Sequence, residues 1–172
     1  GRFIDDIMLP RMLHVAFCRS DYAHARIISI NTVDVGAMPG VVGIFTAQDL
    51  EDEFKPIRAI SRMADYYATE LGALARGKVR YVGEAVVAVV AQSRYLAEDA
   101  AERVVIDYEP LGDAAEPLAN LSNDSPLLHE DAGTNILVTR AFQRGDVDEA
   151  MDGAAVRVRD TFRMHRKTPA AM

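Results

Sequence analysis

The stretch RYVGEAVVAVVAQSRYLAEDAAERVVIDYEPL (Arg80–Leu111) carries the clearest structural pattern in the chain. Residues 85–91 are almost continuously apolar, which is typical of a strand covered on both faces. Ser93 can cap the helix that follows, in which apolar residues recur at every fourth position and charged residues take the other side. The run VVIDYEPL (104–111) predicts a second strand. Strand, helix and strand with short joints predict a βαβ unit around residues 85–108, with a right-handed crossover.

On the N-terminal side of this unit the sequence predicts three more strands. In MLHVAFCRS (12–20) the side chains alternate with a period of two, which indicates a strand. ARIISI (25–30) and VVGIFT (41–46) predict two others, joined by the turn-forming run NTVDVGAMPG (31–40). Residues 51–79 have weak periodicity, and we expect an excursion there with at most one short helix.

The C-terminal side contains a long connection followed by further elements. Residues 112–135 are rich in Gly, Pro, Asn, Asp and Ser and predict a connection along the surface. ILVTRAFQRG (136–145) predicts a strand, and DVDEAM (146–151) starts a short helix at capping-box spacing. AAVRVRDTFRMHR (154–166) alternates apolar residues with arginines and predicts a long, half-exposed C-terminal strand. Together these elements predict an α+β (mixed α/β) fold with a mixed sheet, in two packed portions.

Composition limits the classes of function. The chain has 172 residues, of which 49% are hydrophobic and 26% charged, as in an ordinary globular domain. No apolar run approaches the roughly 18 residues of a membrane-spanning helix. The net charge of −7 argues against nucleic acid or an anionic membrane as the partner. With no leader pattern and a single cysteine, we expect a cytoplasmic location.

No residue pattern predicts a metal or nucleotide site. The sequence contains no CxxC, HExxH, GxGxxG or Walker-type loop. No two of the four histidines lie within five residues of each other: His14, His24, His129 and His165. The sequence therefore predicts no metal site and no nucleotide site in these residues.

Two further groups have a structural and a chemical interpretation. Cys18 lies in a strand-like run, which favours a buried, unreactive thiol over a nucleophile. Glu84 precedes the apolar strand, where a carboxylate can act as a base with a shifted pKa. More often such a carboxylate pairs with a nearby arginine such as Arg80, or caps a turn, and we favour that interpretation.

Ser20, Asp21 and His24 supply the residue types of a catalytic triad close together in sequence. Triad members are assembled by the fold and not by adjacency, and no nucleophile elbow is present. The favoured interpretation is a strand end whose Ser20 and Asp21 satisfy a turn. His24 and Arg26 would then bond to backbone or pair with another domain. A small hydrolase that uses Ser20 and His24 stays open as an alternative.

Several ordered motifs resemble a known family. These are GRFIDDI…MLHVAFCRSDYAHARIISI…PGVVGIFTAQDL, then VRYVGEAVVAVVAQSRYLAEDAAERVVIDYEPL, then RGDVDEAM…HRKTPAAM. The set is similar to the start of the large subunit of molybdenum hydroxylases, the xanthine dehydrogenase, aldehyde oxidase and aerobic carbon monoxide dehydrogenase family. The resemblance is strongest over residues 1–50 and 80–111. Phe3, Asp21 and Ala85 depart from the family at turn and packing positions.

The resemblance implies a fold and a role. It implies an a/b hammerhead domain over residues 1–163, with residues 164–172 starting the linker into a molybdopterin-binding domain outside these residues. In that family a molybdenum–molybdopterin centre hydroxylates aldehydes or heteroaromatics, or oxidises carbon monoxide, and iron–sulfur and flavin partners take the electrons. The family's catalytic, metal and cofactor residues match no position here. The resemblance therefore implies a scaffold domain that is inactive alone.

We also expect an inter-domain surface. Its candidate residues come from the stretches RSDYAHARI (19–27) and YVGE (81–84): Arg19, Ser20, His24, Arg26, Gly83 and Glu84. In the full enzyme, alanine at His24 or Glu84 is expected to lower assembly or cofactor retention more than it changes the intrinsic chemistry. A stand-alone scaffold or binding module with the same fold is the alternative, and an apolar face left uncovered would favour a dimer of the isolated chain.

Overall fold

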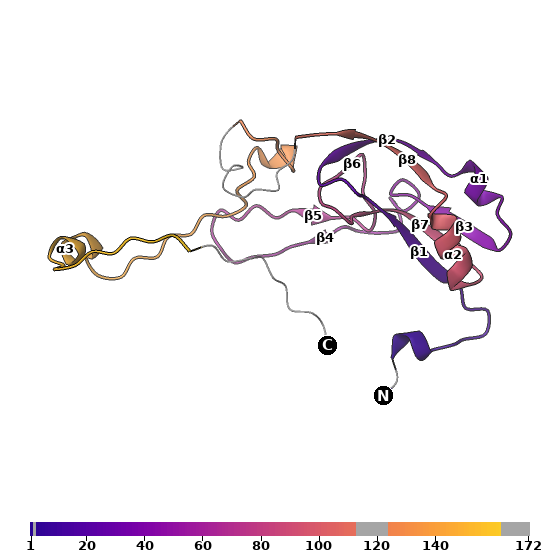
Figure 1. Cartoon of the computed structure of the whole chain (residues 1–172), viewed down its shortest axis with the longest axis horizontal. Coiled ribbons are helices and arrows are strands. Elements are labelled where there is room, and N and C mark those ends of the chain that lie inside the picture. The colour runs from indigo at the N-terminus through magenta and orange to yellow at the C-terminus, as the bar shows by residue number, and fades with distance from the viewer. Residues whose placement is uncertain (2, 113–123, 163–172) are drawn as a thin grey trace. The chain divides into compact units, whose positions relative to one another are not determined.

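The computed structural model describes residue 1 and residues 3–112 and 124–162 (Figure 1). The chain divides into two compact units, Gly1–Thr139 and Arg140–Met172. The first unit holds the sheets and the longest helix, and the described part of the second holds one short helix between two extended segments.

The strands of the described residues all belong to the first unit and are β1 (His14–Arg19), β2 (Ala25–Asn31), β3 (Val41–Phe45), β4 (Ile57–Arg58), β5 (Glu70–Leu71), β6 (Lys78–Val79), β7 (Ala85–Ala91) and β8 (Val105–Pro110). The helices of that unit are α1 (Val33–Gly36) and α2 (Arg94–Ala101), with 3-10 turns at Ile4–Asp6 and Glu130–Ala132. Helix α3 (Val147–Asp152) belongs to the second unit.

The described strands form two three-stranded sheets, β1-β7-β3 and β6-β2-β8, and the small pair β4-β5. Every described ladder is antiparallel, so the prediction of a mixed sheet is wrong. The predicted succession of strand, helix and strand exists as β7, α2 and β8. However, β7 and β8 lie in different sheets, so the predicted βαβ unit does not form. Periodicity shows that a segment is a strand, but it does not show which strand will be its partner.

The core lies around β7 and is built from small side chains. Its fully buried members are mostly valine and alanine: Ala25, Val35, Ala75, Val79, Val86, Val87, Val89 and Ala100. Helix α2 packs on β1 and β7 (Figure 1). The Ser93 side chain accepts a hydrogen bond from the Leu96 backbone N–H at 3.3 Å, which confirms the predicted helix cap.

Two predicted C-terminal strands are absent from the described residues. Residues 136–145 and 154–162 join no sheet, and residues 163–166 of the second prediction lie outside the described residues, as does the predicted linker, 164–172. Residues 154–162 have the side-chain alternation of a strand, but a strand also needs a neighbour with which to exchange a ladder of backbone hydrogen bonds. In 136–145 the Leu137 carbonyl accepts one such bond, from the Tyr67 N–H at 2.9 Å, and no ladder follows. The short helix predicted from residue 146 is confirmed as α3.

Candidate docking surface

Strand β1 turns its larger apolar side chains away from the core. Along the strand, half-buried and exposed residues alternate, and Cys18 lies on the half-buried side. Val15 and Phe17, on the other side, are 52% and 46% exposed. A strand packed for this chain alone would bury valine and phenylalanine first. An exposed group of larger apolar side chains of this kind is typical of a surface that meets a partner.

The neighbouring strands extend this surface. Phe17 pairs with Ala88 of β7, and Ala88 pairs in turn with Phe45 of β3. Directly paired residues of an antiparallel ladder point to the same side of the sheet, so the two phenylalanines flank Ala88. The next row is Val15, Val90 and Gly43. We call this surface the open face and define it by Val15, Phe17, Gly43, Phe45, Ala88 and Val90.

Gly43 leaves room for the Phe45 ring beside it on the open face. A Cβ atom built at Gly43 would come within 3.0 Å of the Phe45 ring. Phe45 is 38% exposed even in this position. Two aromatic side chains, Phe17 and Phe45, thus stand on either side of a floor of small residues, a shape that suits an apolar partner surface.

Arg19 stands at the end of the open face. Its Nη1 donates to the Gly83 carbonyl at 2.9 Å, and its guanidinium carbon lies 5.4 Å from the centroid of the Phe17 ring. Gly83 has φ +87°, a left-handed conformation that glycine adopts without strain. The predicted stretches 19–27 and 81–84 therefore meet at this corner of the sheet.

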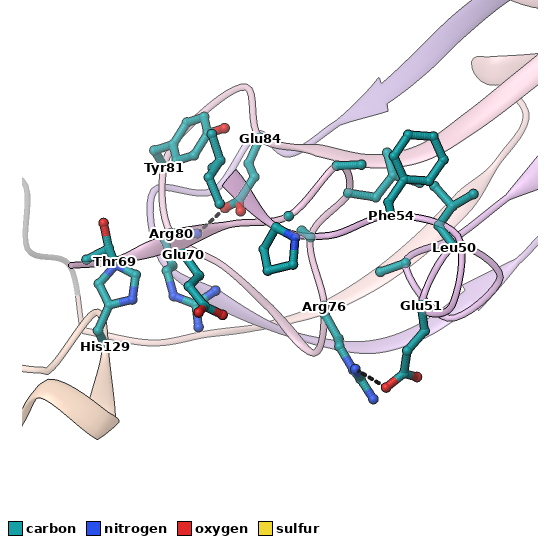
Figure 2. A pocket seen from close by; sticks show the side chains of 17 residues that line it. Leu50, Glu51, Phe54, Thr69, Glu70, Arg76, Arg80, Tyr81, Glu84 and His129 are labelled. Carbon is teal, nitrogen blue, oxygen red and sulfur yellow. Dashed lines mark hydrogen bonds and ion pairs between the residues drawn. The ribbon is translucent and has the colours of Figure 1, made fainter. Parts of the chain in front are cut away.

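Ser20 and Glu84 are buried at the same corner, 2% and 8% exposed. The Ser20 N–H donates to the Glu84 carbonyl at 2.9 Å, and the Ser20 hydroxyl exchanges two bonds of 3.0 Å with the backbone of Tyr22. The Glu84 carboxylate accepts from the Arg80 N–H at 2.5 Å, which confirms that it caps a turn (Figure 2). Both side chains are therefore occupied in holding the turn against β1.

His24 and Lys78 form a second buried cluster. His24 is 4% exposed, and its Nδ1 lies 2.8 Å from the Gly112 carbonyl. Its Nε2 lies 3.4 Å from the Lys78 ammonium, which also donates to the Glu130 carboxylate at 2.6 Å. A neutral ring with its proton on Nδ1 satisfies both His24 contacts. The hydrogen bond from Lys78 lowers the pKa of Glu130, and the cluster fastens the 3-10 turn Glu130–Ala132 to β6.

The structure does not assemble the alternative hydrolase site. The Ser20 hydroxyl is engaged by Tyr22 and the His24 ring by Gly112 and Lys78, so neither is presented to the other as nucleophile and base. Arg26 instead forms a surface ion pair with Glu109 at 3.3 Å, and both side chains are more than half exposed.

The six candidate interface residues thus separate into two groups. Arg19 and Arg26 are exposed and Gly83 is half-buried, whereas Ser20, His24 and Glu84 are buried within their own unit. Sequence reasoning missed the open face. Its signal was present in the alternation of MLHVAFCRS, but the pattern alone does not decide which side of the strand is buried.

A pocket of about 450 Å³ lies beside Arg80 and Glu84, which are among the residues that line it (Figure 2). Glu51 and Arg76 form an ion pair of 2.6 Å on its wall, and Tyr81 and His129 also line it. Burial, and then the charge of Arg80, lower the pKa of His129. Within residues 3–112 and 124–162, no group of three or more His, Cys, Asp or Glu side chains is arranged to hold a metal ion.

Cys18 carries no reactive chemistry in this fold. Its Sγ donates to the Ala101 carbonyl at 3.2 Å, and burial raises the pKa of the thiol to about 11. At neutral pH the reactive thiolate is scarce, as predicted from its place in a strand. None of the described helices has the length and apolar character needed to cross a membrane.

These features define an α+β domain with an open apolar face and with buried polar groups that serve structure. Residues 1–112 match the family described as "Aldehyde oxidase and xanthine dehydrogenase, a/b hammerhead domain". The chain belongs to this family, and the resemblance and α+β hammerhead fold inferred from the sequence are confirmed.

Relatives of known activity are much longer. The chain is 36% identical to the carbon monoxide dehydrogenase large chain of Afipia carboxidovorans, over 100% of this chain and 22% of that protein. It is 32% identical to the xanthine dehydrogenase molybdenum-binding subunit of Escherichia coli O157:H7, over 98% and 22%. In the crystal structure of quinoline 2-oxidoreductase from Pseudomonas putida 86, a 35% identical region superimposes with a TM-score of 0.85, covering 90% of this chain and 20% of that one. The chain thus spans about a fifth of each relative.

Proposed function

We propose that the chain is the scaffold domain of the large subunit of a molybdopterin-dependent hydroxylase, inactive on its own. We call the longer protein the parent protein. The observation that supports this most is the match of the whole chain to a fifth of a molybdenum-enzyme large chain, together with the absence of a metal-binding cluster in the described residues.

In this proposal the open face docks against the rest of the parent protein. Phe17, Phe45 and Val15 are 46%, 38% and 52% exposed, and covering such side chains stabilises an interface by about 1 kcal/mol each. Arg19 borders the open face as an exposed cation, whereas Arg26 lies on β2 in the other sheet, in an ion pair with Glu109. The buried Ser20, His24 and Glu84 support that surface from within the domain.

The parent protein would carry a molybdenum–molybdopterin group, which supplies the oxygen-transfer or carbon monoxide chemistry, with iron–sulfur and flavin partners as electron acceptors. The described residues do not fit that group. The buried cations and carboxylates are bonded within the chain, and Tyr108 is a phenol whose pKa is raised by burial. The role of this chain is to position the domain that holds the group. A cytoplasmic location is part of the same proposal.

The test is to express the complete gene and to measure molybdenum per protein chain. We expect near-stoichiometric molybdenum in the parent protein and none in the 172-residue chain. A complete protein that folds without molybdenum would support the alternative, a scaffold or binding module with the same fold. Labelling of Ser20 by a serine-directed fluorophosphonate would instead support the hydrolase, and we expect no labelling.

A further inference from the structure

The segment 154–162 has the side-chain pattern of a strand with one covered side. Val156, Val158 and Phe162 fall on one side of an extended chain together with a single charged residue, Asp160, and the other side carries Arg157, Arg159 and Thr161. Such alternation is typical of a strand whose apolar side packs on a protein interior and whose basic side faces water.

The segment nevertheless has no strand neighbour. None of residues 155–162 shares a backbone–backbone hydrogen bond with another described residue, and none belongs to a described sheet. Val156, Val158 and Phe162 are 79%, 83% and 86% exposed. The Thr161 N–H donates to the Asp160 carboxylate at 2.7 Å, but the backbone of the segment joins no described ladder. An extended chain of this kind with an apolar side can pair with a sheet edge.

The structure around α3 fixes where this segment begins. The Asp146 carboxylate caps the helix by accepting from the Glu149 N–H at 2.9 Å. Arg157 donates to the Asp152 carbonyl at 3.0 Å, which ties the start of the segment to the end of the helix. Val147 and Met151, four residues apart on α3, are 50% and 48% exposed and offer a second apolar contact.

We infer that residues 154–162 complete the edge of a β-sheet in the part of the parent protein outside this chain. The inference rests on the proposed function, because it needs that longer protein. The hammerhead family match ends at residue 112, whereas the alignment to the carbon monoxide dehydrogenase large chain covers all of this chain. A segment shared with the long relatives but outside the hammerhead match fits a partner within the same long protein. The predicted domain boundary at 163 then moves to about residue 140, where the second unit begins.

Hydrogen exchange followed by mass spectrometry tests this directly, on the 172-residue chain and on the parent protein. We expect the amides of 155–162 to exchange about 100-fold more slowly in the parent protein than in the chain, because the ladder protects them. Equally fast exchange in both would overturn the inference. Protection that appears in the 172-residue chain and rises with its concentration would identify a second copy as the partner, which also overturns it.

A matched pair of variants sharpens the test. Val158→Asp should reduce the protection of 155–162 in the parent protein at least tenfold, since it places a charge on the covered side. Val33→Asp, at a valine that is 79% exposed on α1, should leave it unchanged. If the parent protein with Val158→Asp does not accumulate, the inference is still tested by comparing hydrogen exchange of 155–162 in the wild-type chain and the wild-type parent protein.

Molybdenum measured on the same preparation separates the two proposals. Protected amides without molybdenum would contradict the proposed function and leave the strand intact. Bound molybdenum with unprotected amides in 155–162 would support the proposed function and overturn the inference that the segment completes a sheet edge.

Discussion

Strand β7 and the segment 154–162 are both rich in valine and alanine, and the sequence predicts a strand in each. Val87 and Val89 are completely buried between two neighbouring strands, whereas Val156 and Val158 are 79% and 83% exposed. The difference shows that composition provides a strand with its apolar surface, but the partner decides whether a sheet forms. Where the partner is part of the same folded unit, the strand becomes core. Where it is not, an apolar segment is left exposed.

The largest effect is expected when the same charge is introduced into β7 and into the segment 154–162. Val89→Asp should lower the free energy of unfolding by about 4 kcal/mol or more, because it buries an unpaired carboxylate. Val158→Asp should change it by less than about 0.5 kcal/mol in the 172-residue chain, because the position is exposed. Urea denaturation of both variants measures the effect. Similar losses would show that 154–162 is part of the folded core.

A smaller effect is expected in the buried polar cluster. His24→Ala should cost about 1–3 kcal/mol of unfolding free energy, because it leaves the Gly112 carbonyl without its His24 partner and removes one of the contacts of Lys78. Arg26→Ala, which breaks an exposed ion pair, should cost about 0.5 kcal/mol or less. The same denaturation experiment applies, and equal costs would contradict the division of the interface residues into buried and exposed groups.

Removing the N-terminal cap of a helix should have a smaller effect on stability, and it should differ between the two units. Ser93→Ala should lower the unfolding free energy by about 1 kcal/mol, since α2 packs on the core. Asp146→Ala removes the corresponding cap of α3, none of whose residues is buried, and should leave the global transition unchanged. A shifted transition for Asp146→Ala would mean that the second unit unfolds together with the first.

The smallest prediction concerns pH. Burial raises the pKa of Cys18 from an ordinary value of 9.0 to about 11. The folded state therefore holds the thiol proton more tightly than the unfolded state, so this contribution to stability is complete below pH 9 and is lost as pH rises towards 11. The difference between wild type and Cys18→Ala should shrink over that window. Since Tyr108 also has a raised pKa, the comparison with Cys18→Ala isolates the thiol. A constant difference would contradict the assignment.

The sequence predicted those features that depend on residues close together in the chain, and it did not predict contacts between distant segments. The residue ranges of β1, β2, β3, β7 and α2, and the Ser93 cap, follow from patterns within a few residues and were predicted closely. The pairing of β8 with β2 could not be predicted, because it joins segments that are 74 to 85 residues apart in sequence, as in Asn31–Val105 and Ala25–Pro110. The same applies to the Lys78–Glu130 pair, 52 residues apart.

The inter-domain surface expected from the sequence stays a prediction, and the apolar residues of the open face were missed. The stretches 19–27 and 81–84 do meet, through Arg19 and Gly83. Val15 and Phe17 were missed, because alternation in a strand defines two sides without saying which one faces the core. That choice is made by α2 and β7, and only the folded structure shows it.

The most direct test of the scaffold role is the molybdenum content of the parent protein carrying Phe17→Asp, compared with Val33→Asp, both at exposed positions. We expect Phe17→Asp to lower molybdenum per chain several-fold, because it places a charge on the open face, while turnover per bound molybdenum stays unchanged. Val33→Asp should alter neither. Full molybdenum with lost turnover for Phe17→Asp would contradict the scaffold role, because the open face would then take part in the chemistry and not in docking.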